Sequence, residues 1–391
     1  MGQLRIGLIG ASGRGATLAE HWHKPKGRSA VVAAADISLA GLEQFRDKVN
    51  DKAFCTTNYQ DLLENEKIDA IAICSPDYTH EEYAIAAFEA GKHVFTEKPM
   101  AITTEGCDRM LAAWQDSGKE FMVGFNMRYM NIFRVMKDAI DSGTIGEVKA
   151  VWVRHFVAPG GRFYYHDWHA QAKNTTSLLL QKASHDIDMI HWLTGQYTKR
   201  VVAMGALDYY GGDKANNLRC SDCIDKDSCV EYQSPDTEHG NNLMDLCAFR
   251  KEVDVEDNSI MMMELENGIK ASYMQNHFAP DYHRNYTIIG TEGRIENLDD
   301  SKQIVLKLRD KSNRWQNLAE HKINIKTKKG SHGGADGVIA KDFVDMVLDG
   351  KKPIATPLAG RMSVAAGVAA SQSIRNNWQA IEIPKVPKEI L

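Results

Sequence analysis

A glycine-rich turn between the first apolar run and the first helix-like segment limits most strongly how this chain can fold. Leu4 to Ile9 is strand-like, and Thr17 to His23 is compatible with a helix. Glycines at such a turn let backbone N–H groups approach a pyrophosphate at the helix N-terminus. The pattern is an imperfect G-x-G-x-x-G, because a serine holds the second glycine position, and a turn without a ligand is the alternative. The residues expected to border a nucleotide here are Gly10, Ser12, Gly13, Arg14 and Gly15.

Strand-like and helix-like segments alternate through residues 1–125, which predicts a parallel sheet covered on both faces. Beyond residue 126 the strands lengthen and alternate, as in Val148 to Phe156, which indicates an open, mostly antiparallel sheet. Two helix-like segments, Gly337 to Leu348 and Leu358 to Asn377, close the chain. We therefore predict an α/β plus α+β protein, with a doubly wound Rossmann domain over 1–125 and a second domain over 126–391.

The charge balance narrows the classes of partner. Lys and Arg total 47 against 52 Asp and Glu, a net charge of -5, which argues against a nucleic-acid surface or an anionic-membrane anchor. No apolar run approaches the ~20 residues of a membrane helix, and the N-terminus lacks the pattern of a secretory signal. Seven cysteines, an odd number, suggest a reducing compartment. We expect a cytoplasmic protein without a membrane or nucleic-acid partner.

An acidic residue follows the second strand-like run, Ala30 to Ala35. Asp36 lies 21 residues past Gly15, close to the ~20 residues expected of the ribose-binding acid in a dinucleotide site. A carboxylate there accepts hydrogen bonds from the adenosine ribose hydroxyls and repels a 2′-phosphate. The position predicts NAD rather than NADP, with a strand-end turn aspartate as the alternative.

Two later strand ends carry polar residues expected to border the same cofactor. One strand runs into Ser75-Pro76-Asp77-Tyr78-Thr79-His80, and the next into Glu97-Lys98-Pro99. In doubly wound sheets, ligands lie outside the carboxyl ends of the strands. A lysine whose pKa is lowered by burial, or by the cofactor's positive ring, can hydrogen-bond a substrate alcohol and relay its proton. The expected cofactor contacts are Ser75, Pro76, Thr79, His80, Glu97 and Lys98.

The three motifs GLIGASGRG, SPDYTH and EKP, in this order and spacing, resemble the Gfo/Idh/MocA group of nicotinamide-dependent oxidoreductases. The resemblance covers essentially the whole chain. It implies a Rossmann domain, an antiparallel open-sheet domain and a catalytic role for Lys98. It also implies tight nucleotide binding, sugar or cyclitol substrates, and homodimers or homotetramers formed through the open sheet.

The resemblance further singles out the helix-like segment Leu178 to Trp192, where the family carries Asp-x-x-x-His. His185 fits the histidine, but Gln181 stands at the aspartate position, which leaves Lys98 and His185 as the acid–base pair. A histidine satisfied at a helix start is the alternative. Helical spacing would place Gln181, His185 and Asp188 on one face and pair Lys182 with Asp186. We expect Asp188 to be an anchor rather than a catalyst.

Residues just after the first domain, and a loop before that helix, complete the predicted site. The resemblance places Asn126 and Arg128 beside nicotinamide and substrate. An aromatic and polar loop suits a sugar, with surface packing as the alternative; it comprises Tyr164, His166, Asp167, Trp168 and His169. We expect Asn126 to contact the cofactor. The expected substrate contacts are Arg128, Trp168, His169, Gln181 and Lys182.

A cysteine cluster occupies the irregular stretch from Tyr209 to Asn258. Its spacing is Cys220-x2-Cys223-x5-Cys229, followed by Cys247. Four thiolates suffice for a tetrahedral structural zinc site. Free thiols or a chance cluster are the alternatives.

We predict an NAD-dependent oxidoreductase that moves hydride between nicotinamide and a ring carbon of a sugar, glycoside or cyclitol. One alternative is glycoside cleavage through transient oxidation of the sugar, with no net redox change. Another is a non-catalytic nucleotide-binding sensor.

Overall fold

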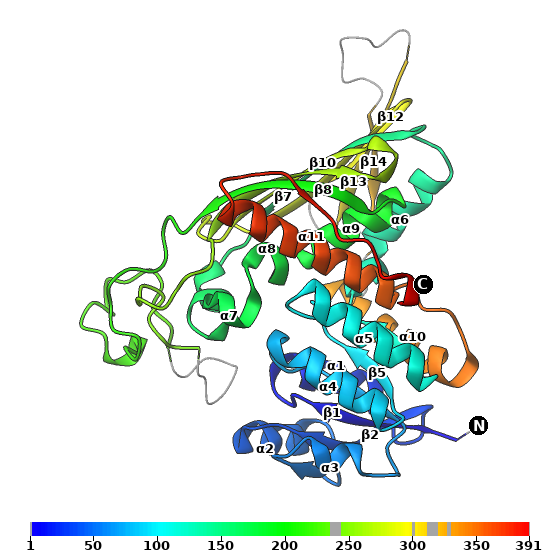
Figure 1. Cartoon of the computed structure of the whole chain (residues 1–391), viewed down its shortest axis with the longest axis vertical. Helices are drawn as coiled ribbons and strands as arrows, with labels where there is room; N and C mark the ends of the chain where they lie inside the picture. Colours follow the sequence, from blue (N-terminus) through cyan, green and yellow to red (C-terminus); the bar gives the residue numbers. More distant parts are fainter. Residues whose placement is uncertain (1, 235–243, 299–301, 311–319, 327–329, 391) are drawn as a thin grey trace.

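The chain forms two sheets at opposite ends of the molecule, with helices between them (Figure 1). The computed structural model describes residues 2–234, 244–298, 302–310, 320–326 and 330–390. Among these, no helix combines the length and apolar character needed to cross a membrane.

The first sheet has six parallel strands in the order β3-β2-β1-β4-β5-β6. The order reverses between β1 and β4, so their carboxyl ends form the switch point where doubly wound sheets bind ligands. Ile9 of β1 stands level with Ala35 of β2 and Ile73 of β4, which brings three predicted site segments to one edge. The strands are β1 (Leu4–Ile9), β2 (Ser29–Ala35), β3 (Phe54–Thr56), β4 (Ala70–Ile73), β5 (His93–Thr96) and β6 (Phe121–Val123).

Two helices of this half begin at side-chain caps, whereas the first begins at Gly13, four residues before the predicted start at Thr17. The Ser38 and Thr103 side chains accept backbone N–H groups at the starts of α2 and α5, and α5 stops at Gly118, whose φ is +62°. The predicted Rossmann fold is confirmed. Its helices are α1 (Gly13–Trp22), α2 (Leu39–Lys48), α3 (Gln60–Leu63), α4 (His80–Glu89) and α5 (Thr104–Ser117).

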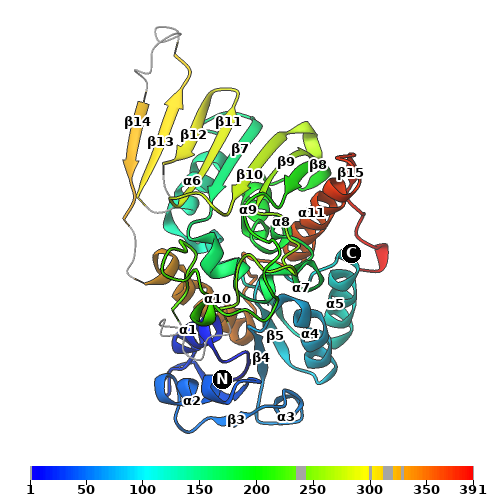
Figure 2. The same cartoon turned by 90° about the vertical axis from the view of Figure 1, so that its left-hand side faces the viewer.

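The second sheet fans out over nine strands in the order β14-β13-β12-β11-β7-β10-β9-β8-β15 (Figure 2). Only the central pair, β7 and β10, is parallel among its described pairings, which confirms the predicted open, mostly antiparallel sheet. The sequence did not indicate the edge strands β14 and β15, nor β12 between β11 and β13. The bounds are β7 (Val148–Phe156), β8 (Thr198–Ala206), β9 (Asn258–Leu265), β10 (Lys270–Asn276), β11 (His283–Gly290), β12 (Gly293–Asn297), β13 (Gln303–Leu308), β14 (Glu320–Asn324) and β15 (Ile381–Glu382).

Helices cover one face of the second sheet, and the opposite face presents apolar side chains to solvent. On β9, for example, Met261 and Met263 are buried while Ile260 and Met262 are exposed. The predicted homodimer or homotetramer through this face stays a prediction. The remaining helices are α6 (Asn131–Asp141), α7 (Ala172–Thr175), α8 (Leu178–Gln181), α9 (Ser184–Thr194), α10 (Ala335–Asp349) and α11 (Pro357–Arg375).

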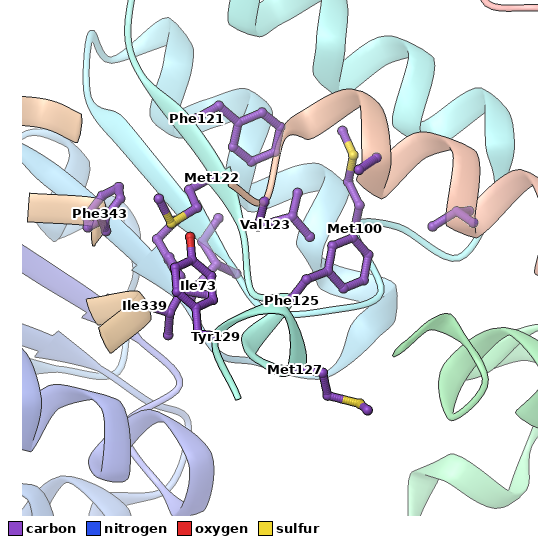
Figure 3. Packing of buried hydrophobic residues seen from close by; sticks show 14 of the residues in the cluster. Ile73, Met100, Phe121, Met122, Val123, Phe125, Met127, Tyr129, Ile339 and Phe343 are labelled. Carbon is purple, nitrogen blue, oxygen red and sulfur yellow. The ribbon is translucent and has the colours of Figure 1, made fainter. Parts of the chain in front are cut away.

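Helix α10, which the sequence assigns to the second domain, returns to pack on the first sheet and on α1. Ile339 lies beside Ile73, the last residue of β4, and beside Tyr129, which follows β6 (Figure 3). The Phe343 ring is 5.9 Å from Trp22 and 5.6 Å from Phe95, and the Trp22 indole N–H donates to the Ala340 carbonyl at 3.0 Å. The last part of the chain therefore completes the core of the first.

Candidate active site

Two glycines of the first turn are required by close approach. A Cβ on Gly10, whose φ is +86°, would lie 2.7 Å from the Cys74 carbonyl carbon, and one on Gly15 would lie 1.8 Å from the Gly10 oxygen. Because neither residue has a Cβ, the start of α1 can approach the ends of β1 and β4 this closely. At Gly13 an added Cβ would meet nothing within 4 Å. The turn therefore leaves open space at a helix N-terminus, which suits a pyrophosphate.

Asp36 lies beside this turn, as predicted. Its Oδ2 accepts hydrogen bonds from the backbone N–H groups of Ala11 at 2.8 Å and Ser12 at 3.2 Å, and from the Ser12 hydroxyl at 3.0 Å. Ser12 therefore orients the carboxylate. Together with the glycine turn, Asp36 fits the adenosine half of NAD.

Arg14 and Asn126, both predicted cofactor contacts, meet at Asp336, a carboxylate that the sequence did not indicate. Arg14 pairs with Glu97 at 2.7 Å and with both oxygens of Asp336 at 2.7 and 2.9 Å. The Asn126 amide also donates to Asp336, at 2.9 Å. Hydrogen bonds from His332 and Arg14 hold the pKa of Asp336 well below its usual range, although burial opposes them. Asn126 Oδ1 is buried without a protein partner in the described chain, which leaves an acceptor for a ligand.

The loop after β4 is held by its own side chains. The Ser75 and Thr79 hydroxyls are 2.6 Å apart, and Thr79 donates to the Pro76 carbonyl at 2.7 Å. Buried His80 places its ring nitrogens 2.8 Å from the Pro99 carbonyl and 2.9 Å from the Ser75 carbonyl. His80 therefore ties the two predicted cofactor loops together, and neither nitrogen remains for the direct cofactor contact that the sequence predicts.

Lys98 projects from the end of β5 toward the second domain. Its ammonium nitrogen donates to the Gln181 carbonyl at 3.0 Å. Burial lowers the pKa of Lys98, and Tyr164 and Asp77 counter that effect. Asp77 is buried, its Oδ2 has no partner among the described residues, and burial raises its pKa. Sequence reasoning did not choose Asp77, although its place in the SPDYTH motif was a usable signal.

The predicted continuous helix Leu178 to Trp192 is wrong, because the chain breaks between α8 and α9. The Gln181 carbonyl accepts from Lys98 and from the Ser184 hydroxyl, at 3.1 Å, instead of extending α8. His185 consequently lies in the first turn of α9. Burial, with the positive charges of Lys98 and Arg284, lowers the pKa of His185 well below its usual value. The imidazole is therefore neutral near pH 7, and its buried Nδ1 has no protein partner in the described chain.

Asp186 belongs to a buried network behind His185, which replaces the ion pair predicted with Lys182. Its carboxylate lies 3.0 Å from His155 Nδ1, accepts from the Tyr273 hydroxyl at 3.0 Å, and lies 3.2 Å from Arg284 Nε. Arg284 and His155 hold the pKa of Asp186 well below its usual range against the opposing effect of burial. This network fixes the first turn of α9.

Arg128, predicted to contact substrate, is placed as a buried anchor. Its buried guanidinium pairs with Asp188 at 2.6 and 2.8 Å, and donates to the Ile354 carbonyl at 2.5 Å. The pair joins the 3₁₀ turn Asn126–Tyr129 to α9. The anchoring role expected for Asp188 is therefore seen.

The aromatic loop lies against the loop after β4. The Trp168 ring stacks on His169 at 3.6 Å and meets the Tyr78 ring at 6.0 Å. Lys182 places its ammonium 5.5 Å from the centre of the Tyr164 ring. These contacts bring the predicted substrate residues Trp168, His169 and Lys182 to the side of the site that holds Asp77 and Lys98.

Two histidines that the sequence did not single out for the site, His155 and His277, line the same region. Both are fully buried. His277, 5.2 Å from the Tyr164 ring, has no partner on either nitrogen among the described residues, and neither does His155 Nε2. Buried polar groups without partners cost free energy, so they mark places where a bound polar molecule hydrogen-bonds. Single histidines at strand ends carry no motif that would have revealed them.

The four cysteines predicted to bind zinc gather at one cavity distant in sequence from these motifs: Cys220, Cys223, Cys229 and Cys247. All four are free thiols. As their side chains are placed, no three His, Cys, Asp or Glu groups within the described ranges form a metal centre. A formed zinc centre is therefore not seen.

Two family models match the chain. The model for an oxidoreductase family with an NAD-binding Rossmann fold covers residues 4–125, and that for the GFO/IDH/MocA C-terminal domain covers 133–296. A putative oxidoreductase, YteT of Bacillus subtilis (strain 168), is 27% identical over 369 residues, 85% of either chain. Inositol 2-dehydrogenase of Salmonella typhimurium is 33% identical over 172 residues, which are 44% of this chain and 48% of that relative.

Solved structures match over nearly the full length. A levoglucosan dehydrogenase in complex with NADH and levoglucosan has a TM-score of 0.78 at 20% identity, over 98% of this chain and 100% of that one. An oxidoreductase domain protein from Kribbella flavida has a TM-score of 0.79 at 20% identity, with the same coverage. At these identities the likeness shows a shared fold.

Proposed function

Because the chain belongs to the Gfo/Idh/MocA family of oxidoreductases, we propose that it is an NAD-dependent dehydrogenase of a sugar, glycoside or cyclitol hydroxyl. The observation that carries the proposal is the position of Lys98. Lys98 follows β5 at the carboxyl end of the nucleotide-binding sheet, and its ammonium donates to the Gln181 carbonyl at the break between α8 and α9. Neutral His185 lies beside it. This arrangement brings a proton acceptor to the place where the nicotinamide and substrate halves of the site meet.

The chemistry divides between the cofactor and this chain. Bound NAD supplies the hydride acceptor. Burial lowers the pKa of Lys98, so its amine can accept the proton of the substrate hydroxyl. The hydrogen on the same carbon leaves with its electron pair, and the carbon that carried the hydroxyl becomes a carbonyl carbon. Neutral His185 hydrogen-bonds the same oxygen and can pass the proton on. The balanced outcome is one ketone, one reduced nicotinamide and one released proton.

A polyhydroxylated substrate matches the unpartnered polar groups. Asp77 Oδ2, Gln181 Oε1 and both nitrogens of His277 are buried without partners in the described structure. Several hydroxyls on one small ring would satisfy them together, whereas a simple alcohol would satisfy one. Inositol and levoglucosan, named in two of the matched proteins, are molecules of this kind.

The coenzyme preference is tested at Asp36. We expect Asp36→Ala to lower kcat/KM for NAD by about 10- to 150-fold, the value of a lost charge-assisted hydrogen bond of ~1.5–3 kcal/mol. The variant should lose less with NADP, because the carboxylate that repels a 2′-phosphate is gone. The measurement is the ratio of kcat/KM for the two coenzymes, with exposed Asp51→Ala as the matched control. An unchanged ratio would show that the Asp36 carboxylate does not bind the ribose hydroxyls.

The activity itself is tested with NAD or NADP and a panel of free sugars, methyl and aryl glycosides, and inositols. We expect steady NADH formation with at least one class and a ketone product identified by mass spectrometry. Aglycone release without NADH would replace net oxidation by the transient-oxidation route. Absence of both signals, with NAD binding intact, would contradict an enzyme of this substrate class.

A further inference from the structure

The cysteine cluster gathers four thiols from both ends of one irregular segment. Cys220, Cys223, Cys229 and Cys247 line a single cavity with His166 on its wall. The cavity is small. The centre of a water-sized atom could move within about 20 Å³ of it, so it has room for about one such atom. No element of the proposed dehydrogenase chemistry uses these residues.

The backbone holds the thiol-bearing turns together. The Cys220 N–H donates to the Asp245 carbonyl at 2.6 Å, and the Cys247 N–H to the Leu218 carbonyl at 2.8 Å, which pins the two ends of the segment side by side. Cys223 and Cys229 follow on tight turns, in which the Cys229 N–H donates to the Asp225 carbonyl at 3.0 Å. The main chain thus brings all four thiols to one cavity.

Burial raises the pKa of the Cys220 and Cys247 thiols, and one backbone donor beside each sulfur counters that effect. The backbone N–H of Phe249 donates to the Cys247 sulfur, and that of Gln233 to the Cys220 sulfur. N–H···S bonds of this kind support metal-bound thiolates from outside the coordination shell. His166 adds a further polar neighbour, since its Nδ1 lies 3.7 Å from the Cys220 sulfur and 2.6 Å from the Leu246 carbonyl.

We propose that Cys220, Cys223, Cys229 and Cys247 bind one structural zinc ion. Four soft sulfur ligands select zinc over magnesium or calcium, and a tetrahedral set of four leaves no open position for catalysis. Because no three ligand groups among the described residues meet at metal-binding distance without the ion, binding draws the sulfurs inward across a cavity of one-atom size. Four Zn–S bonds form, and the four thiol protons are released.

The position of the centre gives it a structural role in the proposed active site. Fully buried Arg250 donates to the Cys247 carbonyl at 3.0 Å, to the Tyr165 carbonyl at 2.5 Å and to the Asp167 carbonyl at 3.0 Å. Arg250 therefore connects the cluster to the aromatic loop that carries Trp168 and His169. This role rests on the proposed function, whereas the metal site does not.

Metal content tests the site without reference to activity. Protein produced in zinc-supplemented medium and washed free of loose metal should carry about one zinc per chain by elemental analysis. Cys223→Ser and Cys229→Ser should each lose most of it, whereas Cys55→Ser, a half-buried free thiol on β3, should keep it. A zinc-free parent protein, or zinc retained in both cluster variants, would overturn the proposal even if the dehydrogenase assay succeeded.

A second measurement covers the case in which a serine variant does not fold. Intact parent protein is titrated with an organomercurial reagent in the presence of a zinc-sensitive dye, and the modified cysteines are located by mass spectrometry. Zinc should appear in step with modification of the four cluster thiols. No released zinc, zinc release that precedes their modification, or a disulfide joining two of them in the untreated protein would overturn the proposal.

Discussion

Replacing Lys98 with methionine is expected to lower kcat by about 10²- to 10⁴-fold, the usual contribution of a positioned acid–base group, while leaving NAD affinity nearly unchanged. Methionine keeps much of the length of the side chain but cannot accept the hydroxyl proton. Lys98 donates to the Gln181 carbonyl at 3.0 Å and makes no hydrogen bond to the glycine turn, so the nucleotide half should stay intact. Steady-state kinetics and titration of NADH fluorescence measure the two quantities separately.

Two further variants sharpen this result. Lys98→Arg keeps the positive charge but stays protonated, so it should be nearly as inactive as the methionine variant. Exposed Lys52→Met is the matched control and should be fully active. Because burial lowers the pKa of Lys98, alcohol oxidation by the parent enzyme should fall as pH drops through that pKa. Undiminished turnover in Lys98→Met would remove this residue from the mechanism.

Arg128→Ala is expected to cost about 3–5 kcal/mol of unfolding free energy, the usual effect of breaking a buried ion pair. The change leaves the Asp188 carboxylate, 1% exposed, without its main partner. Burial already raises the pKa of Asp188, and Arg128 counters that effect. In the variant this pKa rises further, so the loss should be largest at neutral pH and shrink as pH falls and Asp188 is protonated. Denaturant unfolding at several pH values measures it.

The double variant Arg128→Ala/Asp188→Leu is the control. Removing both charges leaves no unpaired buried carboxylate, so stability should recover part of the loss and should no longer depend on pH through this pair. A single Arg128→Ala variant as stable as the parent, but with a raised substrate KM, would restore the substrate-binding role that the sequence suggested.

Most of the fold could be predicted because its signals are local. The predicted strand Val148 to Phe156 coincides with β7. Apolar residues alternate along these nine residues, and that alternation alone indicates a half-buried strand. The break between α8 and α9 could not be predicted. Lys98, 83 residues away, and Ser184 bind the Gln181 carbonyl, and helical spacing alone contains no sign of that competition.

The residues of the candidate site also fall into two groups, those that local motifs could predict and those whose role depends on distant partners. The glycine turn and Glu97-Lys98-Pro99 were predictable because each carries its function in adjacent residues. An arginine after a strand suits either a substrate or a buried carboxylate, so the role of Arg128 depended on where Asp188 lies. Asp336, which holds Arg14 and Asn126, follows no motif and comes from the far end of the chain.

The contact between Arg14 and Asp336 also imposes an order on synthesis. The two residues are separated by 322 positions, so at about 5–20 residues per second the ribosome adds the start of α10 roughly 15–65 s after it has added the glycine turn. Throughout that interval the nascent nucleotide-binding domain lacks the helix that pairs with Arg14 and covers Trp22. The cofactor pocket is thus finished by residues translated long after the glycine turn, and a nascent chain that stops before α10 would expose an unfinished apolar surface to chaperones and proteases.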